Sequence, residues 1–247
     1  MLNADDIHVW IFSPGSHSTL ESEKPFPLSP EERERQERFR SPVDGRRFAF
    51  GRRMLRALLA GYASSSPEEI CIGYNSFGKP RATAPEKAAA VHFNLSHAGE
   101  AALAAFSRKG PLGVDLERKD PSLDCMSLSG RFFHPEEHER MGQAQPAERT
   151  DFFFLLWVLK ESVLKATGTG FAGNPAGPCV LTAALRGHSR RGSVFHGSRE
   201  WETLSFEPLE GHAAAVAFSG PAQRVLFFCP GHGSAVEDTA PSPLSGH

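Results

Sequence analysis

The sequence predicts an α+β fold in which antiparallel sheets pack against helices. Residues 91–117 hold three short runs of alternating apolar and polar side chains separated by turns, a pattern typical of an antiparallel meander. Residues 151–165, DFFFLLWVLKESVLK, are strongly apolar apart from a few charges, as expected of a helix packed into a core. Residues 179–228 alternate strand-like runs with turn residues, which predicts a closing antiparallel sheet.

Composition and charge describe an ordinary globular protein and exclude little else. The 247 residues are 40% hydrophobic and 23% charged, with a formal net charge of −2. This length allows one large domain or two of about 120 residues, each able to bury a core. The near-neutral charge gives no reason to expect nucleic acid or a membrane surface as a partner.

Cysteine spacing and apolar runs point to no metal site, disulfide framework or export signal. The four cysteines are scattered without a CxxC or CxH pair. The first residues, MLNADDIHVWIF, carry acids where a signal peptide needs basic residues. No stretch approaches the about 20 apolar residues of a spanning helix. A reducing cytoplasm is therefore the expected location.

The N-terminal part predicts one strand and two helices. Ile7 to Phe12 alternate weakly and predict a strand, followed by a loop rich in Ser, Pro and Gly through Pro27. Ser29, followed by a proline and two acids, is typical of a helix start. A longer helix is expected from Asp44 to Ala60. Its arginines are expected to form a basic surface: Arg46, Arg47, Arg52, Arg53 and Arg56.

The predicted meander brings polar residues together at one edge of its sheet. The first strand ends at His97, the second runs back, and the third returns along residues 112–117. Four residues should then lie at the same edge, roughly 10 Å apart across two strand spacings: Ser96, His97, Asp115 and Glu117.

The strand GVDLE, residues 113–117, places two carboxylates on one face. The two-residue period of a strand directs Asp115 and Glu117 to the same side, where they repel each other unless a cation lies between them. Carboxylate oxygens suit Mg²⁺, which completes its octahedron with waters and phosphate oxygens. An exposed edge strand with acids on its wet face also explains the pattern. A third carboxylate would favour the metal.

The apolar helix supplies such a carboxylate. At about 100° per residue, Trp157, Glu161 and Lys165 share one face, and the opposite face is apolar. The simplest alternative is an ordinary Glu–Lys pair at i,i+4, worth about 0.5 kcal/mol. Lys160 lies on the other side of Trp157 and has no predicted role.

Two loops are candidates for phosphate contacts. In NSFGKP, Gly78 permits a turn, Pro80 stiffens its exit, and Lys79 is displayed between them. Ser96 and His97, at a strand end with free backbone amides, could hold an anion. A plain surface lysine and a structural histidine are the simpler alternatives. No P-loop, GxGxxG or nucleophile motif is present, so these features favour a metal-assisted reaction at a pyrophosphate.

Four ordered sequence blocks resemble the surfactin-synthetase-type 4′-phosphopantetheinyl transferases. The family pattern is GKP, FNxSH, GxDxE and WxxKExxxK, and all four blocks occur here in that order between Phe77 and Lys165. Similarity is weaker before these blocks and fades after Phe171. The resemblance implies transfer of phosphopantetheine from coenzyme A to a serine of an apo acyl or peptidyl carrier protein, with release of adenosine 3′,5′-bisphosphate.

The resemblance also implies two similar α/β halves, a pseudo-two-fold duplication with the active site in the cleft between them. We expect an N-terminal half (1–111) with the coenzyme A nucleotide contacts and a C-terminal half (112–230) with the metal and catalytic residues. The polar tail (231–247) is expected to be disordered. A monomer is expected. Fatty acid, polyketide and nonribosomal peptide carriers all remain open, as does acceptance of acyl-coenzyme A.

Carried over position by position, the resemblance assigns the site residues. The ligands of Mg²⁺, or alternatively Mn²⁺, are Asp115, Glu117 and Glu161. The coenzyme A contacts are Arg35, Arg47, Gly78, Lys79, Pro80, Ser96, His97 and Lys165. Glu161 and Lys165 are the catalytic pair: Glu161, directly or through a metal-bound water, removes the proton of the carrier serine, and Lys165 stabilises the leaving bisphosphate. Arg35 and Arg47 are assigned to the 3′-phosphate, although Glu32 and Phe48 stand nearby where relatives can show Lys and Thr.

Two alternative functions fit parts of the sequence. Residues 134–138, HPEEH, fit the HxxEH pattern of inverted zinc proteases, but Pro135 marks a helix start that leaves His134 at the cap, and no third ligand is signalled. A catalytically silent carrier-protein-binding module would keep the fold without turnover, yet every metal and lysine position is filled here. The segment Ser122–Leu128 is the predicted docking loop for the carrier.

Overall fold

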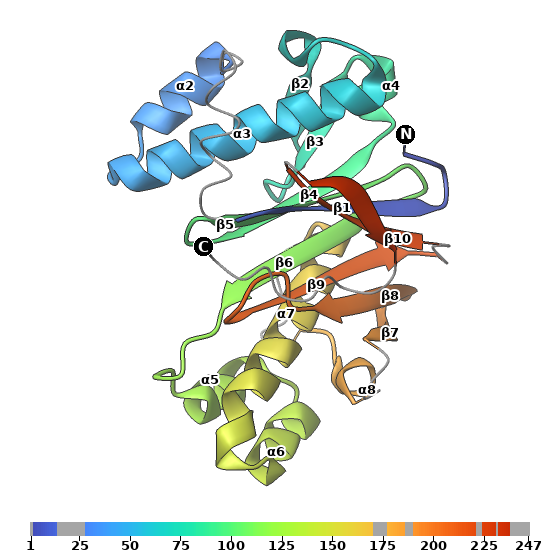
Figure 1. Cartoon of the computed structure of the whole chain (residues 1–247). Helices are drawn as coiled ribbons and strands as arrows, with labels where there is room; N and C mark the ends of the chain where they lie inside the picture. The colour runs from blue at the N-terminus through green and yellow to red at the C-terminus, as the bar shows by residue number, and fades with distance from the viewer. Residues whose placement is uncertain are drawn as a thin grey trace.

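The structure is a computed structural model that describes residues 2–13, 28–169, 177–185, 190–220, 224–230 and 232–237. It confirms the predicted α+β fold, with two main sheets flanked by helices (Figure 1). The loop expected up to Pro27 lies outside the described residues. Within the described ranges, no helix combines the length and apolar character needed to cross a membrane.

The secondary structure follows the predicted order, with several additions. The helices are α2 (Pro30–Glu37), α3 (Pro42–Ala63), α4 (Glu86–Ala89), α5 (Cys125–Phe132), α6 (Pro135–Gln143), α7 (Arg149–Thr167) and α8 (Leu181–Ala184), with 3-10 turns at Pro67–Glu69 and Pro146–Glu148. The strands are β1 (Asp6–Phe12), β2 (Cys71–Tyr74), β3 (Pro80–Ala84), β4 (His92–Ala98), β5 (Ala101–Ser107), β6 (Leu112–Arg118), β7 (Arg191–His196), β8 (Arg199–Phe206), β9 (His212–Ser219), β10 (Arg224–Cys229) and β11 (His232–Glu237).

The two main sheets stack face to face between two helical layers. The first sheet has the strand order β11-β10-β1-β5-β4, in which β1 and β10 are parallel and the other neighbours antiparallel. The second has the order β6-β9-β8-β7 and is antiparallel throughout. Helix α3 covers the outer face of the first sheet, and α7 covers that of the second (Figure 1). A separate hairpin joins β2 and β3.

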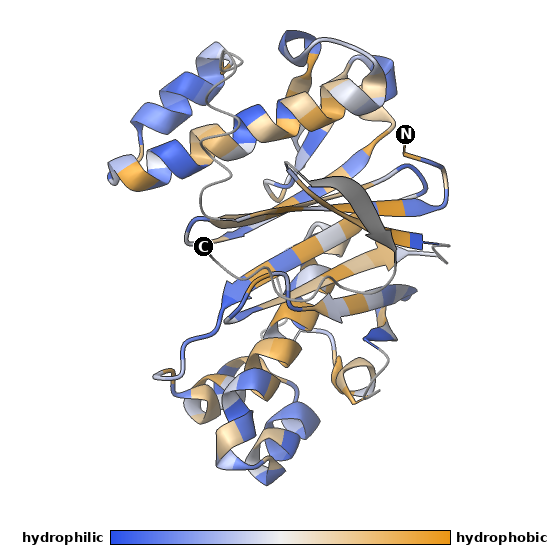
Figure 2. Cartoon of the chain, viewed as in Figure 1, coloured by the Kyte–Doolittle hydropathy of each residue, from blue (hydrophilic) through white to orange (hydrophobic). Residues whose placement is uncertain are grey.

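Strand β5 shows how alternation builds these layers. Leu103 faces the second sheet, where it packs in one core with Val114 and Val216. Phe106 faces the other way and packs in the core under α3. Each side chain of this size contributes roughly 1.5 to 3 kcal/mol when fully buried. Figure 2 shows the hydrophobic residues gathered along the strands, whereas α2 is mostly hydrophilic.

Helix α7 has the faces that its sequence predicts. Trp157, Glu161 and Lys165 are half-buried on one face, and the opposite side is fully buried in the core with α5 and α6. The helix ends at Gly168, whose φ of +74° places it in the left-handed region. Glycine adopts this conformation without the Cβ clash that other residues suffer.

The α2–α3 pair confirms the predicted helix start and corrects the predicted surface. Ser29 caps α2, because its Oγ accepts the Glu32 backbone N–H at 3.2 Å and Glu32 Oε2 accepts the Ser29 N–H at 2.9 Å, a capping box. The basic surface expected on α3 is wrong for two of its arginines. Arg52 is 7% exposed and Arg56 is 5% exposed, because each has a specific partner inside the fold.

The predicted three-stranded meander is wrong in its third strand. Strands β4 and β5 pair as expected, but β6 pairs with β9 in the second sheet. The chain changes layer at the turn before Leu112, and β6 is then buried on both faces for most of its length. Sequence alternation cannot show which sheet a buried strand joins, since pairing with a distant strand leaves no local signal.

The C-terminal segment departs from prediction in four places. Residues 179–185 were expected as a strand but contain α8, because short Ala/Leu runs suit a helix as well. Strand β8 was not predicted. Strand β10 crosses back to pair with β1, so the predicted halves exchange a strand and their boundary stays a prediction. The tail expected to be disordered contains β11, whose backbone pairs with β10.

The predicted docking loop is also partly helical. Residues 125–128 of the segment Ser122–Leu128 form the first turn of α5, which Asp124 caps by accepting the Ser127 backbone N–H at 3.0 Å. An aspartate three residues before a backbone donor is a common N-cap. The loop itself is therefore confined to the residues before Cys125.

Candidate active site

Strand β6 and helix α7 approach closely because a glycine lies between them. A Cβ atom at Gly113 would lie 2.1 Å from the carbonyl oxygen of Ser162 and 2.3 Å from the backbone nitrogen of Ala166. Only glycine fits a backbone approach this close. The contact places Lys165 of α7 beside Asp115 of β6. The glycine of the GxDxE block thus sets the distance at which the charged residues of the two elements meet.

Asp115 lies at the centre of a buried polar cluster. It is 2% exposed, and its Oδ1 accepts hydrogen bonds from Lys165 Nζ at 2.6 Å and from Ser96 Oγ at 3.1 Å. Its Oδ2 is buried and has no hydrogen-bond partner among the described residues. Burying a carboxylate oxygen without a donor is costly. This oxygen therefore suits a cation better than a purely structural role.

The carboxylates of Glu117 and Glu161 share this environment. Burial raises the pKa of Glu161 to about 7, and the charge of Asp115 adds to the shift. Burial and Asp115 also raise the pKa of Glu117, while Lys165 and a hydrogen bond from Trp157 oppose the shift. Glu161 Oε1 is buried with no partner within the described part of the chain. The charge of Asp115 thus disfavours ionisation of both glutamates, an effect that a divalent cation would reverse.

The donor set fits the Mg²⁺ that the family resemblance implies. Asp115, Glu117 and Glu161 offer oxygen atoms, which Mg²⁺ and Mn²⁺ both accept. Two of these oxygens, Asp115 Oδ2 and Glu161 Oε1, are buried and have no donor within the part of the chain that the structure describes. The charge of Asp115 acts on both Glu117 and Glu161, so the three predicted ligands share one electrostatic environment, and metal binding by them stays a prediction.

Edge strand β4 is joined to β6 by side chains instead of a backbone ladder. The Val114 N–H donates to Asn94 Oδ1 at 2.8 Å, and the Leu116 N–H donates to Ser96 Oγ at 3.2 Å. The two strands run in the same direction along this contact, since Asn94 meets Val114 and Ser96 meets Leu116. The predicted 10 Å spacing between Ser96 and Asp115 is therefore wrong, since their side chains touch. The Ser96 hydroxyl holds β6 in place, and its predicted phosphate contact stays untested.

His97 lies near two positive groups. Burial lowers the pKa of its imidazole, and the charges of Lys165 and Arg47 lower it further. Arg47 forms an ion pair with Asp44 at 3.2 Å and lines the same small recess as His97. A neutral imidazole beside two cations suits an anion. The arrangement agrees with the predicted phosphate contacts of these residues without testing them.

Lys79 occupies an unexpected position, because its ammonium group caps helix α7. Its Nζ donates to three backbone carbonyl oxygens: Leu112 (2.8 Å), Lys165 (2.6 Å) and Ala166 (3.2 Å). Asn75 Nδ2, from the same turn, donates to the Gly168 carbonyl at 3.2 Å. A cation at a helix C-terminus is favoured by the helix dipole. The NSFGKP turn, with Gly78 at φ +83°, thus clamps the end of α7, and its nucleotide contact stays a prediction.

Arg35 stacks on an aromatic pair. Its Cζ lies 5.3 Å from the ring centroid of Phe48 and 5.5 Å from that of Tyr74, and its Nη1 donates to Tyr74 Oη at 3.0 Å. The buried Arg52 stacks on the same rings and donates to the same hydroxyl at 2.8 Å. Two guanidinium groups that share one phenol form a positively charged site. Sequence reasoning missed Arg52 because it treated the α3 arginines as surface residues.

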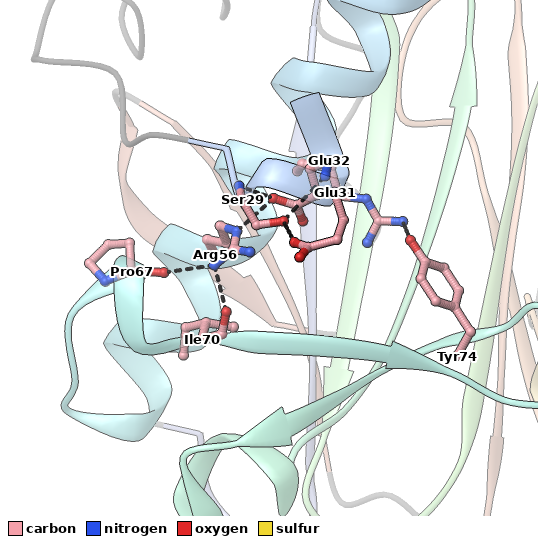
Figure 3. A network of polar contacts seen from close by, with 8 residues as sticks. Ser29, Glu31, Glu32, Arg56, Pro67, Ile70 and Tyr74 are labelled. Atoms are coloured by element: carbon pink, nitrogen blue, oxygen red, sulfur yellow. Dashed lines mark hydrogen bonds and ion pairs between the residues drawn. The ribbon is translucent and has the colours of Figure 1, made fainter. Parts of the chain in front are cut away.

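Figure 3 shows why an acid can stand at position 32. Glu32 Oε2 accepts hydrogen bonds from Arg56 Nε at 3.0 Å and from the Ser29 N–H at 2.9 Å. Arg56 Nη1 donates to the carbonyl oxygens of Pro67 and Ile70 at 3.2 and 2.5 Å. Removing one partner of such a buried pair costs about 3–5 kcal/mol. Glu32 therefore serves to hold α2 on α3, and this pair is also absent from the sequence prediction.

The geometry contradicts the zinc protease alternative. Glu137 of the HxxEH pattern is 0% exposed and binds Lys160 Nζ at 2.6 Å, so it cannot reach a substrate. His138 turns its Nδ1 to Ser129 Oγ at 2.8 Å. His134 lies at the cap of α6, as the proline predicted. The pattern marks a helix start and the partner of Lys160.

The site is suited to metal-assisted chemistry at phosphate groups. It combines three carboxylates, a lysine bonded to one of them, and a histidine near two cations. The family profile described as the 4′-phosphopantetheinyl transferase superfamily matches residues 111–218, and that of the 4′-phosphopantetheinyl transferase N-terminal region matches residues 22–108. The boundary between the matches lies at the passage from the first sheet to the second.

Individual relatives lead to the same family. The 4′-phosphopantetheinyl transferase HetI of a Nostoc species is 32% identical over 219 residues, which cover 89% of this chain and 90% of the relative. A putative 4′-phosphopantetheinyl transferase of Synechocystis, slr0495, is 38% identical over 59% of each chain. The transferase Sfp of Bacillus subtilis is 32% identical over 59% of this chain and 62% of the relative. The chain belongs to the 4′-phosphopantetheinyl transferase superfamily, as its four blocks predicted.

Proposed function

We propose that this transferase moves the 4′-phosphopantetheine group of coenzyme A to a serine of apo acyl or peptidyl carrier proteins and releases adenosine 3′,5′-bisphosphate. The observation that carries the proposal is the group of Asp115, Glu117 and Glu161 beside Lys165, in which two buried oxygens have no hydrogen-bond partner among the described residues. These carboxylates would hold Mg²⁺ or Mn²⁺, which, when bound, withdraws charge from the pyrophosphate.

Lys165 is the residue we assign to the leaving group. Its side chain is 28% exposed while its Nζ is bonded to Asp115, so the ammonium group can meet an anion without leaving the carboxylate. The bond that breaks joins the β-phosphorus of the pyrophosphate to its bridging oxygen, and charge develops on the bisphosphate that departs. A fixed cation at that position lowers the barrier. Lys165 therefore contributes charge stabilisation.

Glu161 is the residue we assign to the proton of the carrier serine. A carboxyl group with a pKa of about 7 is partly ionised at neutral pH and can accept a proton. The serine oxygen forms the new bond to phosphorus, so the nucleophile belongs to the carrier. The only hydroxyl described in the cluster, Ser96 Oγ, is already bonded to Asp115 and to the β6 backbone.

The remaining predicted contacts would receive the nucleotide end of coenzyme A. Arg35, together with Arg52, offers two guanidinium groups for the 3′-phosphate. Arg47 and His97 line a recess beside Lys165 and suit the phosphates nearest the metal. Gly78, Lys79 and Pro80 would line the nucleotide: Lys79 and Pro80 border a cavity of about 520 Å³ that reaches the end of α7.

The test is mass spectrometry of several apo carriers incubated with the full chain, coenzyme A and Mg²⁺. We expect a mass increase of one phosphopantetheine group and formation of adenosine 3′,5′-bisphosphate. The Glu161→Gln variant should fold but lose transfer; near-normal turnover would remove the role assigned to Glu161. A carrier-binding module, the second candidate, would form a complex with the carrier without turnover. Omission of Mg²⁺ tests the metal.

The proposed setting is a cytoplasmic monomer that meets its carrier through charge. Carrier proteins are generally acidic around their serine, and exposed arginines of α2 and α3 would steer such a partner. The loop before Cys125 and the first turn of α5 remain the proposed docking segment. Comparing fatty acid, polyketide and nonribosomal peptide carriers in the same assay would show which system is served.

A further inference from the structure

Lys160 had no role in the sequence analysis, and the structure gives it one. It is 3% exposed, and its Nζ bonds Glu137 Oε2 at 2.6 Å and the Pro178 carbonyl at 2.7 Å. Glu137 also accepts the backbone N–H of His134 at 2.8 Å and that of Val180 at 2.7 Å. The ion pair therefore fixes two backbone segments that are distant in sequence.

The residues fixed in this way present metal-binding side chains to each other. Cys179 lies between Pro178 and Val180, which are both held by the ion pair, and His134 is held at the start of α6. One ligand atom from each of His134, Glu136 and Cys179 lies within 4.8 Å of the other two. A nitrogen, an oxygen and a sulfur donor from two segments thus lie close together.

The His134 ring gives an independent indication. Its Nδ1 is shielded from solvent and has no hydrogen-bond partner among the residues that the structure describes. The Glu137 N–H faces the His134 side chain in a capping box, but it makes its hydrogen bond to the His134 carbonyl oxygen, at 2.9 Å. A buried ring nitrogen with nothing to bond is unfavourable. A metal ion bound at this nitrogen would remove the cost.

We propose that His134, Glu136 and Cys179 form a site for Zn²⁺ in this protein, separate from the carboxylate cluster. Thiolate, imidazole and carboxylate together are typical zinc ligands, and a water would fill the fourth tetrahedral position. Bonds of about 2.0 to 2.3 Å separate tetrahedral ligand atoms by roughly 3.3 to 3.8 Å. The donors must therefore close by at most about 1.5 Å, which the exposed Glu136 and Cys179 side chains can do by rotation.

The chemistry of the two sites keeps their metals apart. Mg²⁺ does not favour a thiolate and suits the all-oxygen cluster, whereas Zn²⁺ binds sulfur and nitrogen strongly. Helix α6 lies at the end of the molecule away from the first sheet (Figure 1). Zinc would fasten α6 to residues 178–180 and so reinforce the support of α7 through Lys160.

The test is a metal titration of the chelator-treated full chain in excess Mg²⁺, which occupies the carboxylate cluster. Co²⁺ should bind one per chain with a thiolate-to-cobalt charge-transfer band, and Zn²⁺ should displace it. Cys179→Ser should abolish the band. The matched control is Cys71→Ser, an exposed free thiol in β2, which should keep it, as should Glu161→Gln. Absence of the band in the unmodified chain, or its persistence in Cys179→Ser, overturns the proposal.

A second measurement shows whether bound zinc holds the fold together. At about a hundredfold excess over its Kd, Zn²⁺ should raise the Tm of the unmodified chain by about 5 to 10 °C. His134→Gln and Cys179→Ser should lose most of this shift, while Cys71→Ser keeps it. Equal shifts in all four proteins would place the zinc elsewhere and refute the assignment.

Discussion

Replacing Gly113 with alanine should separate β6 from α7 and impair both stability and transfer. The new Cβ would lie 2.1 Å from the Ser162 carbonyl oxygen, whereas ordinary contacts begin at 3.4 Å. The helix must then move outward by about 1.3 Å, because both clashing atoms belong to the backbone and neither can rotate away. The Lys165–Asp115 contact, now 2.6 Å, would lengthen beyond hydrogen-bonding distance.

The expected size of the effect follows from this movement. Overpacking of a core costs about 1–3 kcal/mol, which lowers Tm by roughly 2 to 12 °C in a chain of this size. A misplacement of about 1 Å at a catalytic group can reduce kcat by about a hundredfold. Urea unfolding and carrier modification, measured on the same preparation, give both values.

Two matched glycine variants control for the substitution itself. Gly61 in α3 has nothing within 4 Å of a new Cβ, so Gly61→Ala should stabilise the chain by up to about 1 kcal/mol. In Gly110→Ala the new Cβ would lie 2.4 Å from the Ser219 hydroxyl, which can rotate away, and its other neighbours lie at ordinary contact distance; this variant should cost little. If Gly113→Ala matched these controls in stability and turnover, the close approach would not position the site.

The other predictions concern pH and Lys79. Glu161 has a folded-state pKa of about 7, above its ordinary value of 4.5. Without divalent cations the folded state therefore binds more protons than the unfolded state between these pH values, and stability should fall as pH rises from about 4.5 to 7. Glu161→Gln should flatten this pH dependence and Mg²⁺ should oppose it, whereas an unchanged Tm–pH profile in the variant would contradict the assignment. Lys79→Met should lose about 1.5–3 kcal/mol of stability by freeing the carbonyls at the end of α7. The control is Lys87→Met, at an exposed position of α4. A raised KM for coenzyme A at unchanged stability would instead support a nucleotide contact alone.

Local patterns in the sequence predicted the elements that carry the site. Ser29 and the acids after it predicted the cap of α2, and period-2 alternation placed Asp115 and Glu117 on one face of β6. The helical period likewise placed Glu161 and Lys165 together on α7. Each of these inferences depends on neighbours within a few residues. Such local patterns can be recognised without knowing the contacts that distant segments make.

The side-chain contacts that sequence reasoning missed depend on segments that are distant in the sequence. Lys160 finds Glu137 on another helix, and Lys79 finds the carbonyl groups at the end of α7. Both lysines look like ordinary charges until the fold gives them partners. The pairing of β6 with β9 is of the same kind, since it joins residues about a hundred positions apart with no matching motif. Burial of arginines on α3 followed from Glu32 and Tyr74 for the same reason.

The side-chain junction between β4 and β6 has a consequence for solubility. Both strands are outer members of their sheets, and an outer strand with free backbone groups can recruit a strand from another molecule. Here the amides of Val114 and Leu116 are occupied by Asn94 and Ser96, so each sheet shields the other's edge. The FNxSH block, which was predicted to contact the substrate, therefore also protects the chain against self-association. Variants in this block should be checked for aggregation before a loss of turnover is assigned to catalysis.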